Sequence, residues 1–254
     1  MAAPIVMVHG AFCGGWAFEA FRTPFEAAGH AVLTPDLRGH GESGSVAGLS
    51  MTDYAKDIAA LCASLPEPPI LIGHSLGGLV CQLAAKRTPL KALVLLAPSP
   101  PWGVAGSSME EAVTALGLMM GAAFAQSISP DRTLMRTYSL DRMPRPDRDA
   151  ALARLRPESG RALWEALNWW LDPFMTTSVG TGGLGVPCLV MVGQRDVVHP
   201  PTTARQTAQR LGADYVELAG MSHWLLGETG WQEVATQAWD WLERIEARAD
   251  SGAA

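Results

Sequence analysis

Short apolar runs recur along the chain, and most of them are four or five residues long. Several are apolar throughout, a pattern typical of parallel strands that are covered on both faces of a sheet. We predict six strands, at Pro4–Val8, Ala31–Thr34, Pro69–Ile72, Ala92–Leu96, Cys188–Val192 and Asp214–Leu218.

Amphipathic stretches separate these runs. After Ser50, which suits a helix N-cap, apolar residues from Tyr54 to Leu65 recur on one helical face. A similar face extends from Trp231 to Ile245 near the end of the chain. Strands that alternate with helices form βαβ units. The pattern therefore predicts an α/β fold with a mainly parallel six-stranded sheet and helices on both faces.

The alternation stops once, between Leu96 and Val186. This stretch of about ninety residues has no strand pattern and is too long for a simple connection. Its helical patterns lie at Met109–Phe124, Arg148–Leu155 and Arg161–Trp170. We predict that residues 101–182 form a helical cap inserted after the fourth strand, and that residues 1–100 and 183–254 form the core.

A glycine-rich segment near the end of this stretch contains Gly180, Gly182 and Gly185 at Gly-x-Gly-x-x-Gly spacing. A dinucleotide site needs a strand before such a sequence and a helix after it. Here a helical stretch comes first and a strand follows. We therefore expect no cofactor at these glycines and interpret the segment as a flexible return to the core.

Composition and charge narrow the class of protein. The chain is 48% hydrophobic and 17% charged, whereas globular proteins average about 25% charged residues. These values exclude a disordered tail protein, a coiled coil and a nucleic-acid scaffold, and the net charge of −6 gives no reason to expect a nucleic-acid partner. Eight of the 19 basic residues lie from Arg132 to Arg161, where we expect a solvated helical face rather than an anion-attracting rim.

Cysteine spacing and the chain's apolar runs give no sign of a metal site or a membrane segment. The widely spaced cysteines match neither a zinc pattern nor a redox pair. They are Cys13, Cys62, Cys81 and Cys188, and we expect free buried thiols. The first residues lack the basic region of a signal peptide, and no run of about 18 apolar residues could span a bilayer. We expect a cytoplasmic protein with no membrane partner.

The strongest chemical signal is Gly73-His74-Ser75-Leu76-Gly77. It directly follows the predicted strand that ends at Ile72 and precedes a helical run. A serine between two glycines at a strand-to-helix corner is typical of a nucleophile elbow, in which the tight turn raises the hydroxyl above the sheet edge. We predict that Ser75 is a nucleophile.

A serine nucleophile needs a base, and the base needs an acid that orients it. Asp196 follows the fifth predicted strand, and His223 follows the sixth. Both therefore belong at the same carboxyl edge of the sheet as Ser75, and the chain order Ser, Asp, His is the one expected for this architecture. We choose His223 as the base by position, with His199 as the serious alternative.

The anion that forms during such an attack needs two backbone N–H groups directed at it. One is expected from Leu76, the residue after the nucleophile. The other is expected from the glycine-rich loop after the first strand, where Ala11 is our candidate donor.

Five ordered motifs resemble those of the α/β-hydrolase fold superfamily. They are His9-Gly10, the turn from Asp36 to Ser43, Gly73 to Gly77, Gly193 to Asp196, and Gly220 to His223. The resemblance covers Pro4 to about Pro98, then Val186 to the last helix. It implies an α/β-hydrolase core that lacks the superfamily's first two strands and carries a cap at the usual position.

Within the superfamily, the segment from His9 to Trp16 is similar to the opening of the small plant methylesterase and hydroxynitrile lyase branch and of related bacterial esterases. The lyases have a lysine directly after the catalytic histidine, whereas this chain has Trp224, which argues against cyanohydrin cleavage. A serine at the elbow also disfavours haloalkane dehalogenase and epoxide hydrolase chemistry. The resemblance therefore implies a serine esterase that acts through an acyl-enzyme intermediate without a cofactor.

The cap and the catalytic loops carry aromatic and methionine residues that suit an apolar substrate pocket. We expect contacts with substrate from Phe12, Trp102, Trp164 and Trp224. The expected partner is a small to medium apolar or aromatic ester, and an acidic substituent would suit the nearby arginines. A lactonase, a carbon–carbon bond hydrolase, a perhydrolase and a ligand receptor with little turnover stay open as alternatives, as does a homodimer.

Overall fold

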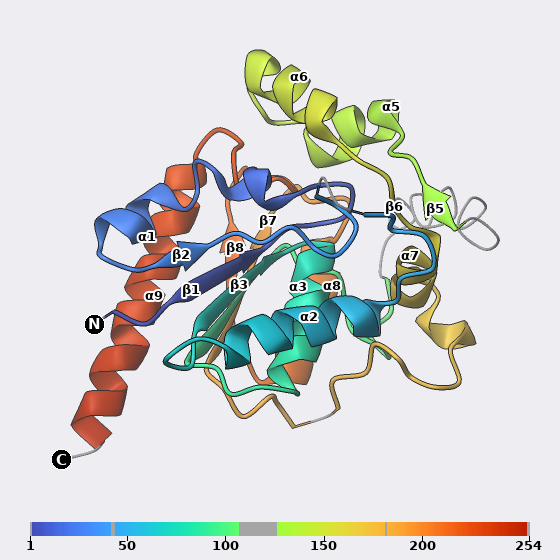
Figure 1. The fold of residues 1–254 in the computed structure, drawn as a ribbon. Coiled ribbons are helices and arrows are strands. Elements are labelled where there is room, and N and C mark those ends of the chain that lie inside the picture. Colours follow the sequence, from blue (N-terminus) through green and yellow to red (C-terminus); the bar gives the residue numbers. More distant parts are fainter. Residues whose placement is uncertain (1, 42–43, 107–125, 181, 253–254) are drawn as a thin grey trace.

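The computed structural model describes residues 2–41, 44–106, 126–180 and 182–252. Its main sheet has six parallel strands in the order β2-β1-β3-β4-β7-β8 (Figure 1). These strands are β1 (Ile5–Val8), β2 (Val32–Leu33), β3 (Ile70–His74), β4 (Ala92–Leu96), β7 (Cys188–Gly193) and β8 (Asp214–Leu218). Each predicted strand is present, so the predicted fold class is confirmed.

Helices cover both faces of this sheet. Along β1, Ile5 and Met7 belong to one apolar cluster, and Val6 and Val8 belong to the other, because alternate residues of a strand point to opposite faces. One face packs against η1 (Gly15–Phe18), α1 (Thr23–Ala27) and α9 (Trp231–Gly252). The opposite face packs against α2 (Met51–Ala63), α3 (Leu76–Ala85) and α8 (Pro201–Leu211). Strands buried on both sides account for the low content of charged residues.

The chain from residue 97 to 187, called here the β4–β7 segment, interrupts the βαβ series. Its described elements are β5 (Ser127–Ile128), α5 (Arg132–Leu134), η2 (Met135–Ser139), α6 (Arg145–Arg154), β6 (Glu158–Ser159), α7 (Gly160–Leu167) and η3 (Trp169–Leu171). The helix predicted at Met109–Phe124 lies outside the described residues. The expectation of no strands was wrong, because β5 and β6 pair as a two-stranded antiparallel ribbon. Two-residue strands are too short to produce a hydrophobic period.

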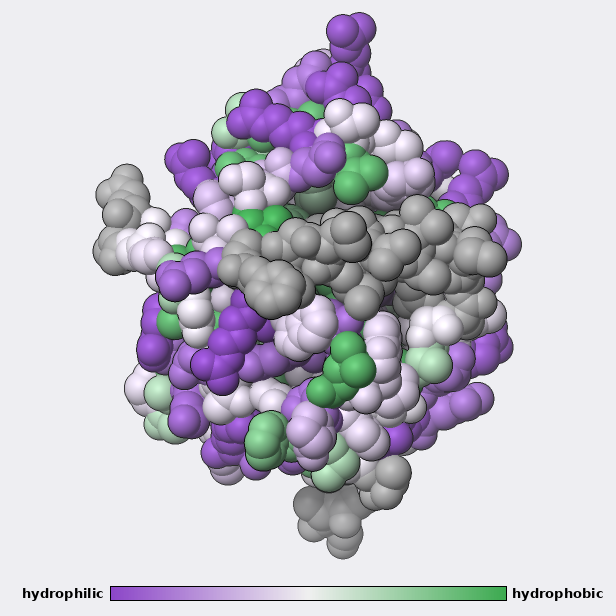
Figure 2. Space-filling view, turned by 90° about the vertical axis from the view of Figure 1, so that its right-hand side faces the viewer, coloured by the Kyte–Doolittle hydropathy of each residue, from purple (hydrophilic) through white to green (hydrophobic). Residues whose placement is uncertain are grey.

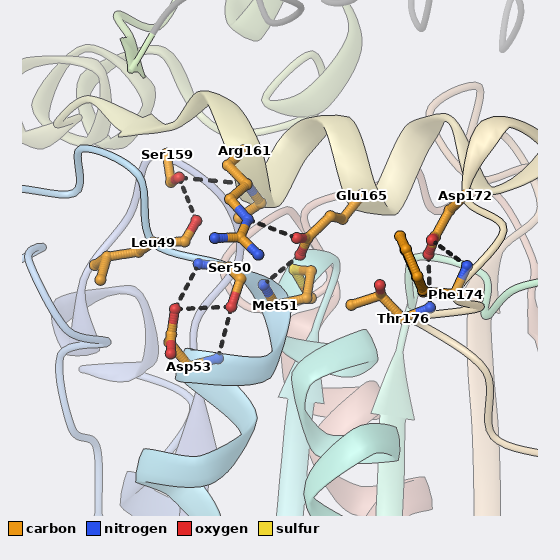
Figure 3. A network of polar contacts seen from close by, with 11 residues as sticks. Leu49, Ser50, Met51, Asp53, Ser159, Arg161, Glu165, Asp172, Phe174 and Thr176 are labelled. Atoms are coloured by element: carbon orange, nitrogen blue, oxygen red, sulfur yellow. Dashed lines mark hydrogen bonds and ion pairs between the residues drawn. The ribbon is translucent and has the colours of Figure 1, made fainter.

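Hydrogen bonds connect the β4–β7 segment to the start of α2 (Figure 3). Ser50 caps α2, and its side chain and that of Asp53 form a reciprocal capping box. The backbone N–H of Met51 donates to Glu165 Oε2 of α7 at 2.8 Å. Because the first N–H groups of a helix have no partner within it, a carboxylate from the β4–β7 segment completes the N-terminus of a core helix.

The side of the molecule drawn in Figure 2 is mostly hydrophilic, with hydrophobic groups on both sides of the grey band. The exposed arginine side chains of the β4–β7 segment form ion pairs, as expected for a solvated face. These pairs are Arg136–Asp149, Arg145–Asp149, Arg154–Glu19 and Arg161–Glu165. Within the described part of the chain, no helix has the length and apolar character needed to cross a bilayer.

Candidate active site

Ser75 lies at the sharp turn between β3 and α3. Its backbone has φ +52° and ψ −122°, a conformation that is strained for any residue other than glycine. The flanking glycines leave room for the turn. A Cβ on Gly77 would lie 2.3 Å from the carbonyl oxygens of Val8 and His9, and one on Gly73 would lie 2.6 Å from Gly77 O. These contacts explain why the turn requires glycine on both sides of the serine.

The side chains of Ser75, His223 and Asp196 form a hydrogen-bonded chain at the carboxyl edge of the sheet. His223 Nε2 lies 3.1 Å from Ser75 Oγ, and His223 Nδ1 lies 2.8 Å from Asp196 Oδ2. Since a carboxylate only accepts hydrogen bonds, Nδ1 carries the proton and Nε2 is free to accept the serine proton. The predicted nucleophile, base and acid are thus brought together.

The charge on Asp196 is favoured inside the protein. Burial alone would raise the pKa of its carboxyl group, but the adjacent His223 and the N–H of His199 outweigh burial and lower the pKa. Its other oxygen, Oδ1, accepts the backbone N–H groups of Val198 and His199 at 2.8 and 2.9 Å. The carboxylate is therefore ionised and fixed in position beside His223.

Two residues that the sequence analysis did not select hold the loop that carries His223. His74 Nε2 donates to the backbone oxygen of His223 at 3.0 Å, and burial lowers the pKa of His74 to about 3. Both oxygens of Glu228 accept the backbone N–H of Ser222, at 2.9 and 3.0 Å. Burial raises the pKa of Glu228 to about 7. Chain position alone gives no sign that Glu228 turns back onto this loop.

His199, the alternative base, occupies a different position. Its Nε2 lies 3.0 Å from Ser99 Oγ, and its ring packs edge-on against His223 with 5.4 Å between ring centroids. Burial is the main reason that the pKa of His199 falls to about 3, so the ring is a weak base. The geometry thus places His223 rather than His199 against Ser75.

A cavity of about 360 Å³ opens above Ser75. Ala11 and Leu76, the candidate oxyanion donors, both line it. Leu76 is the first residue of α3, so its N–H is one of those without a partner inside the helix. The loop that carries Ala11 is held to the β4–β7 segment, because the oxygen of Phe12 accepts the N–H of Arg156 at 2.9 Å.

Of the four residues predicted to contact substrate, two line the cavity and two do not. Phe12 and Trp224 line the cavity, whereas Trp102 and Trp164 are not among its described lining residues. Helix α7 turns Leu163, Ala166 and Leu167 toward the cavity, so Trp164 lies on a different face of the helix. Trp102 packs edge-on against Trp169, which does line the cavity, with ring centroids 5.5 Å apart.

The β4–β7 segment supplies other apolar lining residues instead. They include Val104, Leu134, Met135, Tyr138, Leu163, Ala166, Leu167, Trp169 and Trp170. No arginine occurs among the described lining residues, so the expected preference for an acidic substituent has no support there. The described residues contain no group of three or more His, Cys, Asp or Glu side chains placed to hold a metal ion. The four cysteines are free and buried, as predicted.

Comparison with known proteins finds one matching family model and several relatives. A sequence model of the alpha/beta hydrolase family matches residues 5–237. Salicylic acid-binding protein 2 of Nicotiana tabacum is 40% identical over 109 residues, which cover 41% of this chain and 42% of that protein. A pyrethroid hydrolase of Sphingobium wenxiniae is 35% identical over 94 residues, which cover 36% of this chain and 34% of that protein.

The chain therefore matches less than half the length of either curated relative. Among solved structures, a methylesterase from Arabidopsis has a TM-score of 0.70 at 19% identity, over 97% of this chain and 99% of the other. Similarity at that level of identity shows a shared fold.

Proposed function

Because the chain belongs to the alpha/beta hydrolase family, we propose that it is a serine esterase that cleaves carboxylic esters through an acyl-enzyme intermediate. The observation that carries the proposal is the position of His223, which bridges Asp196 Oδ2 and Ser75 Oγ at 2.8 and 3.1 Å. Relatives named methylesterase and carbendazim hydrolyzing esterase support the same class of reaction.

In the first half-reaction, Ser75 Oγ attacks the ester carbonyl carbon while His223 Nε2 takes the hydroxyl proton. Asp196 stabilises the imidazolium that forms. The backbone N–H groups of Ala11 and Leu76 donate to the tetrahedral oxyanion, and each donor of this kind is worth about 10²–10³ in kcat. His223 then gives its proton to the leaving alkoxide, and the acyl group stays on Ser75.

In the second half-reaction, His223 takes a proton from a water molecule, and the resulting hydroxide attacks the acyl carbon. The tetrahedral intermediate collapses, His223 returns the proton to Ser75 Oγ, and the carboxylic acid leaves. The low pKa of Asp196 suits this role, because the acid must stay ionised through both halves of the cycle.

The cavity supports a small to medium apolar or aromatic ester as substrate. Its volume is about 360 Å³, and Phe12, Met135 and Trp169 are among the apolar residues that line it. Because much of that wall comes from the β4–β7 segment, we propose that residues 101–182 of this segment act as a cap that shapes the pocket and limits the entry of water.

The proposal is tested by turnover of p-nitrophenyl acetate and p-nitrophenyl butyrate. We expect steady hydrolysis by the purified protein, and Ser75→Ala should lower kcat by about 10⁴–10⁶-fold because the nucleophile is lost. Ser64→Ala is the matched control, since the Ser64 hydroxyl is exposed and bonds to Leu61 O at the end of α2.

Melting temperatures of the variants separate loss of chemistry from loss of fold. If folded Ser75→Ala retained more than a tenth of the wild-type rate, Ser75 would not be the nucleophile. If the wild-type protein bound such esters without turning them over, the chain would be a receptor rather than an esterase.

A further inference from the structure

Two polar residues line the cavity beside the candidate catalytic residues and have no part in the mechanism above. Ser99 follows β4, and His199 follows β7 three residues after Asp196. Both line the cavity, and their residues are only 7% and 6% exposed. Ser99 Oγ and His199 Nε2 are 3.0 Å apart, so the two side chains form one buried hydrogen-bonded pair.

The Ser99–His199 pair is held by the same backbone that holds the candidate catalytic residues. The backbone N–H of Ser99 donates to the backbone oxygen of Ser75 at 2.9 Å, and the backbone oxygen of Ser99 accepts from Gln82 Nε2 at 3.2 Å. The N–H of His199 donates to Asp196 Oδ1 at 2.9 Å. Since neighbouring strands lie about 4.8 Å apart, Ser99 stands about one strand spacing from Ser75.

The hydrogen-bond partners define which way the protons of this pair point. Within the described chain, His199 Nδ1 is buried and has no hydrogen-bond partner. A buried N–H without an acceptor is rarer in proteins than an acceptor without a donor. His199 is neutral, since burial lowers its pKa to about 3, so its single proton belongs on Nε2, where it is donated to Ser99 Oγ. The hydroxyl proton of Ser99 is then free to be donated to a ligand in the cavity.

This arrangement does not make a second nucleophile. A histidine with a pKa of about 3 is a poor base, and its Nδ1 has no carboxylate to orient it. What the pair offers is a fixed O–H donor in a wall that is otherwise largely apolar. A buried donor of this kind discriminates strongly between ligands that can and cannot accept its hydrogen bond.

We propose that the Ser99–His199 pair is a polar subsite that binds an oxygen acceptor on the α- or β-carbon of the substrate's acyl group. The preferred substrates are then esters of 2- or 3-oxygenated carboxylic acids, rather than esters of plain aliphatic acids. This inference rests on the proposed esterase function, because it places the oxygen relative to the carbonyl that Ser75 attacks.

The test uses pairs of esters that differ only by an oxygen in place of a methylene group. Ethyl methoxyacetate is compared with ethyl butanoate, and ethyl 3-methoxypropanoate with ethyl pentanoate. For each pair, kcat/KM of the ether ester is divided by kcat/KM of the aliphatic ester. We expect Ser99→Ala to lower this ratio about tenfold in at least one pair, because the variant loses one hydrogen bond to the substrate. The intrinsic reactivity of the esters cancels in the comparison of variant with wild type, because the same esters are used throughout.

His199→Phe keeps a ring at this position and removes the nitrogen that positions Ser99. It should lower the same ratio, and the double variant should lower it no further than the single variants do, since the two residues act as one unit. A purely structural role would lower kcat/KM for both members of a pair and leave their ratio unchanged.

If Ser99→Ala left both ratios within twofold of the wild-type values while Ser75-dependent turnover persisted, the subsite would be wrong and the esterase function would stand. If none of the four esters showed Ser75-dependent turnover, the proposed function would fail and the subsite with it.

Discussion

Two buried pairs of a histidine and a carboxylate occur in the part of the chain that the structure describes, and they look alike in isolation. His223 Nδ1 lies 2.8 Å from Asp196, and His40 Nε2 lies 2.9 Å from Glu158. All four side chains are almost fully buried. The pairs differ in what surrounds them, and that difference separates a candidate catalytic pair from a structural one.

The remaining ring nitrogen of each histidine faces a different environment. His223 Nε2 faces a serine hydroxyl in a cavity, where a substrate can reach it. His40 Nδ1 lies 3.4 Å from the backbone oxygen of Arg38, and the ring packs edge-on against His9 and Tyr54. Among the described residues that line the cavity, neither His40 nor Glu158 occurs.

The pair of His40 and Glu158 joins two parts of the chain. Glu158 belongs to β6 in the β4–β7 segment, whereas His40 and Tyr54 belong to the core. Tyr54 donates its hydroxyl to Glu158 Oε1 at 2.7 Å, so both oxygens of the carboxylate are bound from the core. We therefore expect a catalytic role for a buried histidine–carboxylate pair only where the second ring nitrogen meets a nucleophile that a substrate can reach.

Replacing each carboxylate by its amide tests this comparison most directly. The largest effect on kcat is expected at Asp196. Asp196→Asn should lower kcat for p-nitrophenyl butyrate by about 10⁴-fold, because the amide no longer holds the reactive tautomer of His223 or stabilises its charge. The variant should stay folded, as measured by circular dichroism. If Asp196→Asn kept more than a tenth of the rate, the acid would lie elsewhere.

The matched variant, Glu158→Gln, should show the reverse behaviour. Its free energy of unfolding should fall by about 3 kcal/mol, near the lower end of the range for breaking a buried ion pair, because the amide oxygen still accepts from Tyr54. Chemical denaturation measures this change. Well below the melting temperature, kcat/KM should stay within about tenfold of wild type. A loss of kcat as large as that in Asp196→Asn would remove the distinction between the pairs.

The contrast also shows what sequence can and cannot reveal. Most of the strands were predictable because each is a short apolar run between turns. Ser75, Asp196 and His223 were predictable because each lies just after a strand or in the loop that follows one, and parallel strands bring their carboxyl ends to one edge. No such rule connects His40 to Glu158, which are 118 residues apart and meet only through the packing of the β4–β7 segment.

The apolar and aromatic character of the cavity wall was predictable, but the residues that form it were predictable only in part. An aromatic pocket was expected, but Trp169 and Trp170 line it in place of Trp102 and Trp164. Which face a helix turns toward a cavity depends on its rotation, and a segment that is apolar on more than one side leaves that rotation open. Ser99 was not predicted, for a different reason. A serine after a strand is common, and the sequence around Ser99 does not show that its hydroxyl lies 3.0 Å from His199, which is 100 residues away in the chain.

The smallest effect expected is a pH dependence of the structural pair. Burial lowers the pKa of His40, but the bond to Glu158 and its negative charge outweigh burial and raise the pKa above its ordinary value. For Glu158, burial raises the pKa, but His40 and Tyr54 outweigh it and lower the pKa. The charged pair therefore stabilises the fold fully between about pH 4.5 and 6.5, and less as the pH rises through the raised pKa of His40.

The melting temperature of wild type should thus exceed that of Glu158→Gln by more at pH 5.5 than at pH 9. The gap should narrow by about 2–4 °C, which corresponds to about 1 kcal/mol for a chain of this size. Glu19→Gln is the control, because Glu19 pairs with the exposed Arg154, and neither group changes charge in this range. A gap that stayed constant or widened toward pH 9 would mean that His40 carries no charge at pH 5.5 and is held to the Glu158 carboxylate by a hydrogen bond alone.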